Sequence, residues 1–523
     1  MRLAVSALLL CLGMAATGVS SGAATGQLPE PVSSALKHAR IPLSDVGIVV
    51  QEVDAPAPLI ALNAGKAMNP ASTMKLLTTF AALETLGPAY RWKTEAYLDG
   101  KLENGVLQGN LVFKGYGDPK LTVEQFWMWL HELRQRGLRD IRGDIVLDHG
   151  FFVDPTEIPA QFDNDPTRAY NVGTNALLLN FNAIHLRLIP NGQAASAVLD
   201  PDLAGYTVQN GITASAKLAC RTENAFSASV EGHTIKLEGR IPADCGEVDD
   251  YFSPLPHDEY FFSVFSALWR ELGGTVQGTL RTGHAPALQM PYATYVSPEL
   301  SEVIRDINKF SNNIMARQLF LTLGTADASE IAASGVAAAK GGAGGPEAAD
   351  AQGNRGASAS QGSSETGAKN LAAPANPEPG AGGSIARSIA RMHAWLTTRQ
   401  LDFPELVLEN GSGLSRKERI SAGHLAQLLQ RIAHSPYSAE LEASLPILGV
   451  DGTVKKRFHD SELAGHAHLK TGTLDNVKSL AGFVDGPTGK KWILVFIINH
   501  PHAPLGRVAQ DALLEWVGRQ GGD

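Results

Sequence analysis

The chain is organised around one stretch, N-P-A-S-T-M-K at residues 69–75. Pro70 and Ser72 are typical of a helix start, and the apolar-periodic run 76–86 that follows predicts a helix. Residues three positions apart on a helix share a face, so Ser72 and Lys75 should lie together. Such a pair is a candidate nucleophile and base. The alternative is a serine cap followed by a solvated lysine.

Length and composition bound the function. A chain of 523 residues predicts two or three domains, and an apolar content of 44% is sufficient for a globular core. The net charge of −9 is spread along the chain without a basic block. Because nucleic-acid-binding surfaces are strongly positive, nucleic acid is not expected as a partner.

The N-terminus predicts export. Arg2 is followed by the apolar run 3–16 and by small residues, with cleavage expected after residue 23 or 24. This run is too short to span a membrane, which takes about 20 apolar residues. We therefore expect a signal peptide over residues 1–24 and a periplasmic protein with at most peripheral membrane contact. Cys220 and Cys245 remain after cleavage, and an even pair in an exported chain favours a disulfide over two buried thiols.

The pattern of residue types along the chain changes twice after the Ser72 helix. From Tyr90 onward new strands and helices begin, and the short strands between residues 183 and 258 predict a small all-β unit. Residues 325–383 are rich in Ala, Gly, Ser and Pro and almost lack bulky apolar side chains. Such a segment cannot bury enough surface to offset its ordering entropy, which predicts a disordered insertion.

Two further motifs complete the pattern of the first. S-N-N at residues 311–313 falls at a predicted helix break, and K-T-G-T at residues 470–473 falls on a predicted strand. The combination S-x-x-K, S-x-N and K-T-G in this order is typical of β-lactamases and penicillin-binding proteins.

Each residue of the combined motif has a chemical reason. Ser72 supplies the nucleophilic oxygen, and Lys75 can act as its base only when its amine is neutral. A nearby cation lowers a lysine pKa, and Lys470 is the expected neighbour. Ser311 can relay a proton to the leaving group. Asn313 can hold the substrate amide and hydrogen-bond Lys75.

The K-T-G-T strand is expected to hold the rest of the substrate. Lys470 and Thr471 offer a cation and a hydroxyl to a terminal carboxylate. Gly472 allows a substrate backbone to approach closely. The backbone N–H groups of Ser72 and Thr473 would form an oxyanion hole. This chemistry requires no metal and no cofactor.

On these motifs the chain resembles the low-molecular-mass class C penicillin-binding proteins, in the type 4 branch of D-alanyl-D-alanine carboxypeptidase/endopeptidases. The resemblance covers nearly the whole mature chain. The matching segments are P-A-S-T-M-K at 70–75, G-D-P at 117–119, S-N-N at 311–313, G-S-G-L-S-R at 411–416 and K-T-G-T at 470–473.

The resemblance implies an α/β (α+β) fold of the penicillin-binding, serine β-lactamase-like transpeptidase type. A five-stranded sheet would carry helices on both faces, with two smaller inserted domains, one mostly β, filling the long gap between Ser72 and Ser311. The expected division is catalytic domain 28–90, 291–324 and 384–523, second domain 91–182 and 259–290, β-rich third domain 183–258, and insertion 325–383.

The resemblance also implies the reaction. The family removes a terminal D-alanine or cuts the D-alanyl–diaminopimelate cross-link through an acyl-Ser72 intermediate, so the expected partners are peptidoglycan stem peptides and β-lactams. Family members are often dimers, which makes a homodimer one expected state. An acidic residue of the second domain should hold the free diaminopimelate end. Asp165 is preferred for this role over Asp163, and the alternative is that both are turn-forming aspartates before Pro166.

Three other interpretations remain in view. The pairs His466/His468 and His500/His502 could bind metal, since alternate strand residues share a face, although no H-E-x-x-H motif supports this. A β-lactamase would need a deacylating glutamate loop, and no equivalent loop is evident, so slow deacylation is expected. A catalytically retired cell-wall-binding protein would not need the intact motif residues.

Overall fold

The computed structural model describes residues 27–153, 162–220, 226–325 and 382–520. The predicted signal peptide, residues 1–24, and nearly all of the predicted insertion at 325–383 lie outside these residues. Within the described ranges, every helix is too short or too polar to cross a membrane.

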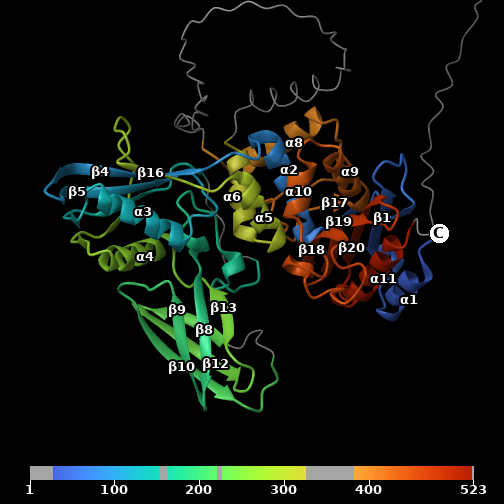
Figure 1. The fold of residues 1–523 in the computed structure, drawn as a ribbon, viewed down its shortest axis with the longest axis horizontal. Helices are drawn as coiled ribbons and strands as arrows, with labels where there is room; N and C mark the ends of the chain where they lie inside the picture. Colours follow the sequence, from blue (N-terminus) through green and yellow to red (C-terminus); the bar gives the residue numbers. More distant parts are fainter. Residues whose placement is uncertain (1–26, 154–161, 221–225, 326–381, 521–523) are drawn as a thin grey trace, which may run out of the picture.

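The catalytic unit is built on a five-stranded antiparallel sheet (Figure 1). Its strands, in spatial order, are β18 (Ala467–Leu474), β19 (Val477–Asp485), β20 (Lys491–Asn499), β1 (Val46–Glu52) and β2 (Ile60–Leu62). Strands from an early and a late part of the sequence therefore meet in one sheet, and the other two units are inserted between them. A short two-stranded pair, β3 (Ala67–Met68) and β17 (Ile420–Ser421), lies beside it.

Helices cover both faces of this sheet because β20 is apolar on both. Ile493 and Val495 belong to the core on one face, whereas Leu494 and Phe496 belong to the core on the other. One face packs against α1 (Glu30–His38) and α11 (Arg507–Gly518). The other face packs under α2 (Lys75–Leu86), α5 (Leu300–Lys309), α6 (Asn313–Leu323), α8 (Ile385–Thr398), α9 (Ala422–Ala433) and α10 (Ser438–Ser444).

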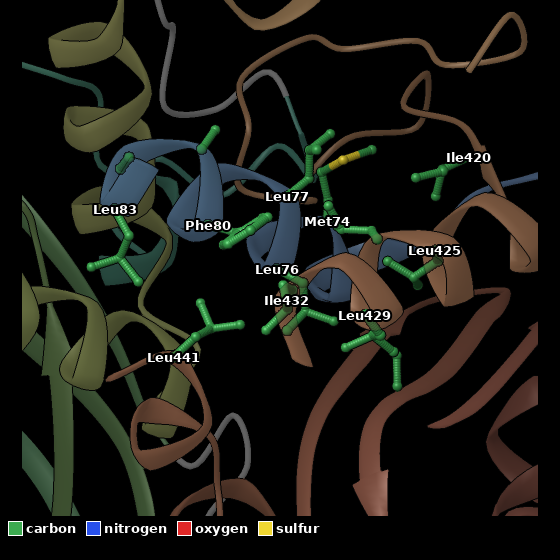
Figure 2. Packing of buried hydrophobic residues seen from close by; sticks show 14 of the residues in the cluster. Met74, Leu76, Leu77, Phe80, Leu83, Ile420, Leu425, Leu429, Ile432 and Leu441 are labelled. Atoms are coloured by element: carbon green, nitrogen blue, oxygen red, sulfur yellow. The ribbon is translucent and has the colours of Figure 1, made fainter. Parts of the chain in front are cut away.

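Helix α2 is the centre of the larger core. Ten of its residues are buried, and Met74, just before it, is also fully buried. Figure 2 shows apolar side chains of α2, α9 and α10, which belong to one core cluster. A helix that is apolar nearly all round is held on every side, which fixes Lys75 at its first position.

A second unit forms a seven-stranded mixed sheet. Its elements are β4 (Lys93–Glu103), β5 (Val106–Gly115), β6 (Asp140–Ile141), β7 (Ile145–Asp148), β14 (Thr275–Val276), β15 (Leu280–Thr282) and β16 (Ala293–Val296), with α3 (Val123–Gln135) and α4 (His257–Glu271). Because β16 pairs with β4, the unit continues past residue 290, and the boundary predicted there is too early. The reason is that this last strand closes the sheet edge after the chain has returned from α4.

A third, six-stranded sheet projects away from the five-stranded sheet (Figure 1). It consists of β8 (Ile184–Asn191), β9 (Ala194–Asp200), β10 (Thr207–Ser215), β11 (Phe226–Glu231), β12 (Thr234–Pro242) and β13 (Val248–Phe252). The expected disulfide between Cys220 and Cys245 is present in this unit. The architecture, a five-stranded sheet between helices with two inserted domains of which one is mostly β, confirms the predicted fold class.

Candidate active site

Ser72 lies in a tight turn directly before α2. Residues Ala71–Met74 form a 3₁₀ turn, and the α-helix begins at Lys75, so Ser72 precedes the first α-helical residue. Ala71 has a positive φ of 47°, a conformation unfavourable for a residue with a side chain. Asn69 holds this turn, since its Oδ1 accepts a hydrogen bond from the Ala71 N–H at 2.9 Å and its Nδ2 donates to the Ser415 carbonyl at 2.8 Å.

Lys75 is fully buried beside Ser72. Its Nζ lies 3.1 Å from Ser72 Oγ and donates to Asn313 Oδ1 at 2.7 Å and to the Ser412 carbonyl. Ser72 and Asn313, which the sequence motifs predicted to act together with Lys75, are thus both within hydrogen-bond reach of the Lys75 amine.

The surroundings of Lys75 favour its neutral form. Burial has the largest effect and lowers the pKa of Lys75 well below its usual range. The positive charges of Lys470 and Arg317 lower this pKa further, whereas Glu418 raises it. Lys470 was expected as the main cause, but the structure gives desolvation the larger part, because α2 buries the whole side chain in the core.

Lys470 lies on β18, across the site from Lys75. It is also fully buried, and its Nζ donates to Ser311 Oγ at 2.8 Å and to the Thr471 carbonyl at 2.9 Å. Burial lowers the pKa of Lys470 to about 7. The two lysines therefore hold Asn313 and Ser311, the two polar ends of the S-x-N motif.

Ser311 is presented by the break between α5 and α6. Helix α5 ends at Lys309, and α6 begins at Asn313 with the side chain of Asn312 accepting from the Met315 N–H at 3.1 Å. Ser311 has a positive φ of 57° in this break. A strained backbone at a residue that contacts a buried lysine is typical of functional sites.

Gly472 lets β18 approach the Ser72 turn. A Cβ at this position would lie 2.3 Å from Ser479 Oγ and 2.9 Å from the Ser72 backbone nitrogen, so no larger residue fits without displacement. Ser479 Oγ donates to the Pro70 carbonyl at 2.6 Å and joins the strand to the turn. This contact brings the backbones of Ser72 and residue 473 together at one edge of the sheet.

Sequence reasoning missed three groups around Lys75. The Ser412 carbonyl accepts from Lys75, and Arg317 lies one helical turn after Asn313 on α6. Glu418 is fully buried, and its Oε1 accepts backbone N–H bonds from residues 409, 410 and 411 at 3.1, 3.0 and 2.9 Å. The spacing of Asn313 and Arg317 was a usable signal, whereas a main-chain carbonyl has none.

The motif residues line one cavity of about 1050 Å³. Ser72, Ser311, Asn313, Thr471, Gly472 and Thr473 all contribute to its wall. Lys75 and Lys470 lie behind this wall and reach it through their hydrogen bonds.

The preferred acidic residue is not in this cavity. Asp165 lines a separate cavity against the six-stranded sheet, and its carboxylate is occupied by Thr167 Oγ1 at 2.7 Å and Arg168 Nε at 2.8 Å. Asp163 lines the cavity of Ser72 instead, and its carboxylate accepts from Asn171 Nδ2 at 2.6 Å and from the Tyr170 hydroxyl at 2.5 Å. The structure thus places Asp163, and not Asp165, at the cavity of Ser72, and the role of either aspartate in holding the diaminopimelate end stays a prediction.

The histidine pairs lie outside the cavity of Ser72. His468 is close to Glu442 and Asp485, but Lys491 Nζ pairs with Glu442 at 2.6 Å and lies 3.9 Å from Asp485. An ammonium thus occupies the position that a cation would take in this group. His502 Nδ1 lies 3.1 Å from the Ala39 carbonyl.

Comparisons with known proteins agree with this geometry. The model of the D-Ala-D-Ala carboxypeptidase 3 (S13) family matches residues 28–340 and 367–520, and the gap between these two ranges falls within the predicted insertion. A D-alanyl-D-alanine carboxypeptidase of Actinomadura sp. is 27% identical over 96% of this chain and 87% of its own length. The D-alanyl-D-alanine carboxypeptidase DacB of Haemophilus influenzae is 25% identical over 87% of this chain and 85% of its own length.

A solved structure shows the same fold. Penicillin-binding protein 4 of Haemophilus influenzae superposes with a TM-score of 0.68 at 23% identity, covering 93% of this chain and 99% of that one. Since the family model spans most of the sequence, the protein belongs to the D-Ala-D-Ala carboxypeptidase 3 (S13) family, which confirms the resemblance to type 4 low-molecular-mass penicillin-binding proteins.

Proposed function

We propose that this protein is a serine-type D-Ala-D-Ala carboxypeptidase and DD-endopeptidase that acts on peptidoglycan peptides through an acyl-Ser72 intermediate. One observation carries the proposal. Lys75, a fully buried lysine with a lowered pKa, lies 3.1 Å from the Ser72 hydroxyl. Its neutral amine can accept the hydroxyl proton across that contact.

The acylation step uses both walls of the cavity. The Ser72 proton passes to Lys75 while Ser72 Oγ bonds to the carbonyl carbon of the penultimate D-alanine. The oxyanion is held by the N–H groups of Ser72 and Thr473. The C–N bond then breaks, and the leaving amine receives the proton from Lys75 by way of Ser311. Water later hydrolyses the ester, which releases the shortened peptide and restores Ser72.

The substrate is oriented by the edge strand. β18 is the outermost strand of its sheet, so an extended peptide can lie along it. Protonated Lys470 and the Thr471 hydroxyl bind the carboxylate next to the scissile bond. Asn313 accepts from Lys75 through Oδ1, which leaves its amide nitrogen to hold the substrate amide.

The acidic residue of the second domain is assigned to Asp163. Its carboxylate lines the cavity and is held by Asn171, so it can accept hydrogen bonds from the ammonium at the free diaminopimelate end. We expect Asp163→Asn to lower kcat/KM for diaminopimelate-containing peptides more than for the D-Ala-D-Ala dipeptide, which contains no diaminopimelate. Asp165→Asn is the matched control, and an equal loss from Asp165→Asn would contradict the assignment.

The expected location of the protein follows from the proposed substrate. Peptidoglycan lies outside the cytoplasm, so we propose that residues 1–24 direct export to the periplasm. The homodimer and any peripheral membrane contact stay predictions.

Release of D-alanine from a disaccharide pentapeptide tests the reaction. Wild-type protein should release D-alanine and form a stable adduct with benzylpenicillin, detected by intact mass. Ser72→Ala should do neither while keeping its melting temperature. Release by wild type no greater than by Ser72→Ala would contradict the proposal, and rapid loss of the penicillin adduct would favour a β-lactamase.

A further inference from the structure

One side of the active-site cavity carries a concentration of positive charge. Five cationic residues line it, here called the basic flank: Lys455, Lys456 and Arg457 after a 3₁₀ turn at Gly452–Val454, Lys478 on β19, and Arg507 at the start of α11. None of these belongs to the three catalytic motifs.

The basic flank is only partly neutralised by the described residues. Asp511 pairs with Arg457, whose Nε lies 2.9 Å away, and with Arg507 at 3.5 Å. Within the described residues, Lys455, Lys456 and Lys478 make no ion pair with a carboxylate. An excess of cations in a concave wall attracts an anionic ligand.

Lys478 is the most constrained of these cations. It is half-buried, and its Nζ donates to Thr473 Oγ1 at 3.0 Å. Burial lowers the pKa of Lys478, and the positive charges of Arg457 and Arg507 lower it further. An anion bound beside these three side chains would relieve their mutual repulsion.

The basic flank lies next to the K-T-G-T motif in space. Thr473 Oγ1 accepts from the flank residue Lys478, and Thr471 Oγ1 donates at 2.8 Å to Oγ1 of Thr453, which lies two residues before Lys455. Asp163, Phe162 and Leu414 line other parts of the same cavity. The cavity thus has a carboxylate-bearing part and a cationic part.

This placement bears on the leaving group. In the function proposed above, the acyl group stays on Ser72 and the carboxylate beside the leaving amine lies on Thr471. Any part of the leaving peptide that continues beyond that amine must pass Thr471 and Thr473. A released D-alanine ends there, whereas the peptide released from a cross-link continues and carries further carboxylates, such as that of its glutamate.

We propose that the basic flank is a subsite for the carboxylates of the leaving stem peptide, which makes it a determinant of cross-link cleavage. The assignment rests on the proposed function. It names a carboxylate-bearing peptide as the ligand, in contrast to a phosphate-bearing wall polymer.

The first test compares two substrates. The Lys455→Gln/Lys456→Gln double variant and Lys478→Gln are assayed for kcat/KM on a cross-linked muropeptide dimer and on an uncross-linked pentapeptide. The ratio of dimer to pentapeptide should fall about tenfold, since exposed charge pairs each contribute little but add. Lys490→Gln is the matched control, because Lys490 is an exposed lysine paired with Glu52 elsewhere on the sheet and should leave the ratio unchanged.

The second test changes the substrate instead. A dimer whose leaving-peptide glutamate is amidated should be cut by wild type about as slowly as the double variant cuts the unmodified dimer, and the two changes together should not add. An unchanged ratio in the flank variants overturns the proposal, as does an equal loss on the pentapeptide. Inhibition by polyphosphate without any effect of amidation would also overturn it, in favour of a phosphate polymer. Absence of Ser72-dependent D-alanine release would overturn the proposed function itself.

Discussion

Lys75 and Lys470 lie behind two walls of one cavity and differ in what surrounds them. Both are fully buried, which is rare for lysine. Lys75 is reached by the charges of Lys470 and Arg317, and its pKa lies well below the usual range. The pKa of Lys470 is lowered by burial to about 7. In the proposed reaction the two lysines have different tasks, since a base must be neutral and a carboxylate ligand must be charged.

The two lysines come from distant parts of the chain and from different kinds of element. Lys75 begins a helix whose burial is nearly complete, whereas Lys470 lies on an edge strand whose continuation lines the cavity. In the proposed reaction, a substrate carboxylate beside Lys470 would favour its charged form, and the charge of Lys470 lowers the pKa of Lys75 in addition to burial. Binding and proton transfer therefore support each other.

Exchange of each lysine for arginine should give the largest difference. Lys75→Arg should slow acylation by benzylpenicillin about a thousandfold, because guanidinium stays protonated and cannot act as a base. Lys470→Arg keeps its charge and should lose only about tenfold, from the larger group in a packed site. Both rates are measured as adduct formation by intact mass.

The melting temperature of both arginine variants serves as the folding control. Near-normal labelling of folded Lys75→Arg would refute Lys75 as the base. Equal losses in the two variants would show that the two walls do not divide the work.

The pH dependence should separate the walls next. Lys470 is protonated below its pKa of about 7 and loses its charge as the pH rises through that value. Because kcat/KM reports the free enzyme, kcat/KM for a peptide ending in D-Ala-D-Ala should fall about tenfold between pH 7 and pH 8.5. The same peptide with a C-terminal amide offers no carboxylate and should show no such fall. Parallel profiles for the two peptides would contradict the role of Lys470.

The parts of this site that follow periodic geometry could be predicted from the sequence. The three-residue spacing of Ser72 and Lys75 and the alternation along β18 place those side chains before any tertiary contact is known. The family resemblance supplied the five-stranded sheet, and the apolar run of β20 is the physical reason for helices on both faces.

The rest depends on loops whose partners are far away in the sequence. The choice between Asp163 and Asp165 rests on one turn, in which Thr167 and Arg168 take the second carboxylate. The Ser412 carbonyl reaches Lys75 only because a buried carboxylate holds the preceding backbone. Residue types do not choose between the two aspartates, and the G-S-G-L-S-R match at 411–416 does not show that its backbone reaches Lys75.

Glu418, that buried carboxylate, gives the smallest and sharpest test of the comparison. It raises the pKa of Lys75 and opposes Lys470 and Arg317, so its removal should lower that pKa further. Glu418→Gln keeps an oxygen for the three backbone donors, and we expect the acidic limb of the acylation profile to move about half a pH unit lower. Glu405→Gln is the matched control, because Glu405 accepts from the Ser421 N–H at 2.8 Å and is not among the groups that shift Lys75. An unmoved limb in folded Glu418→Gln would mean that Glu418 positions the loop without setting the charge of Lys75.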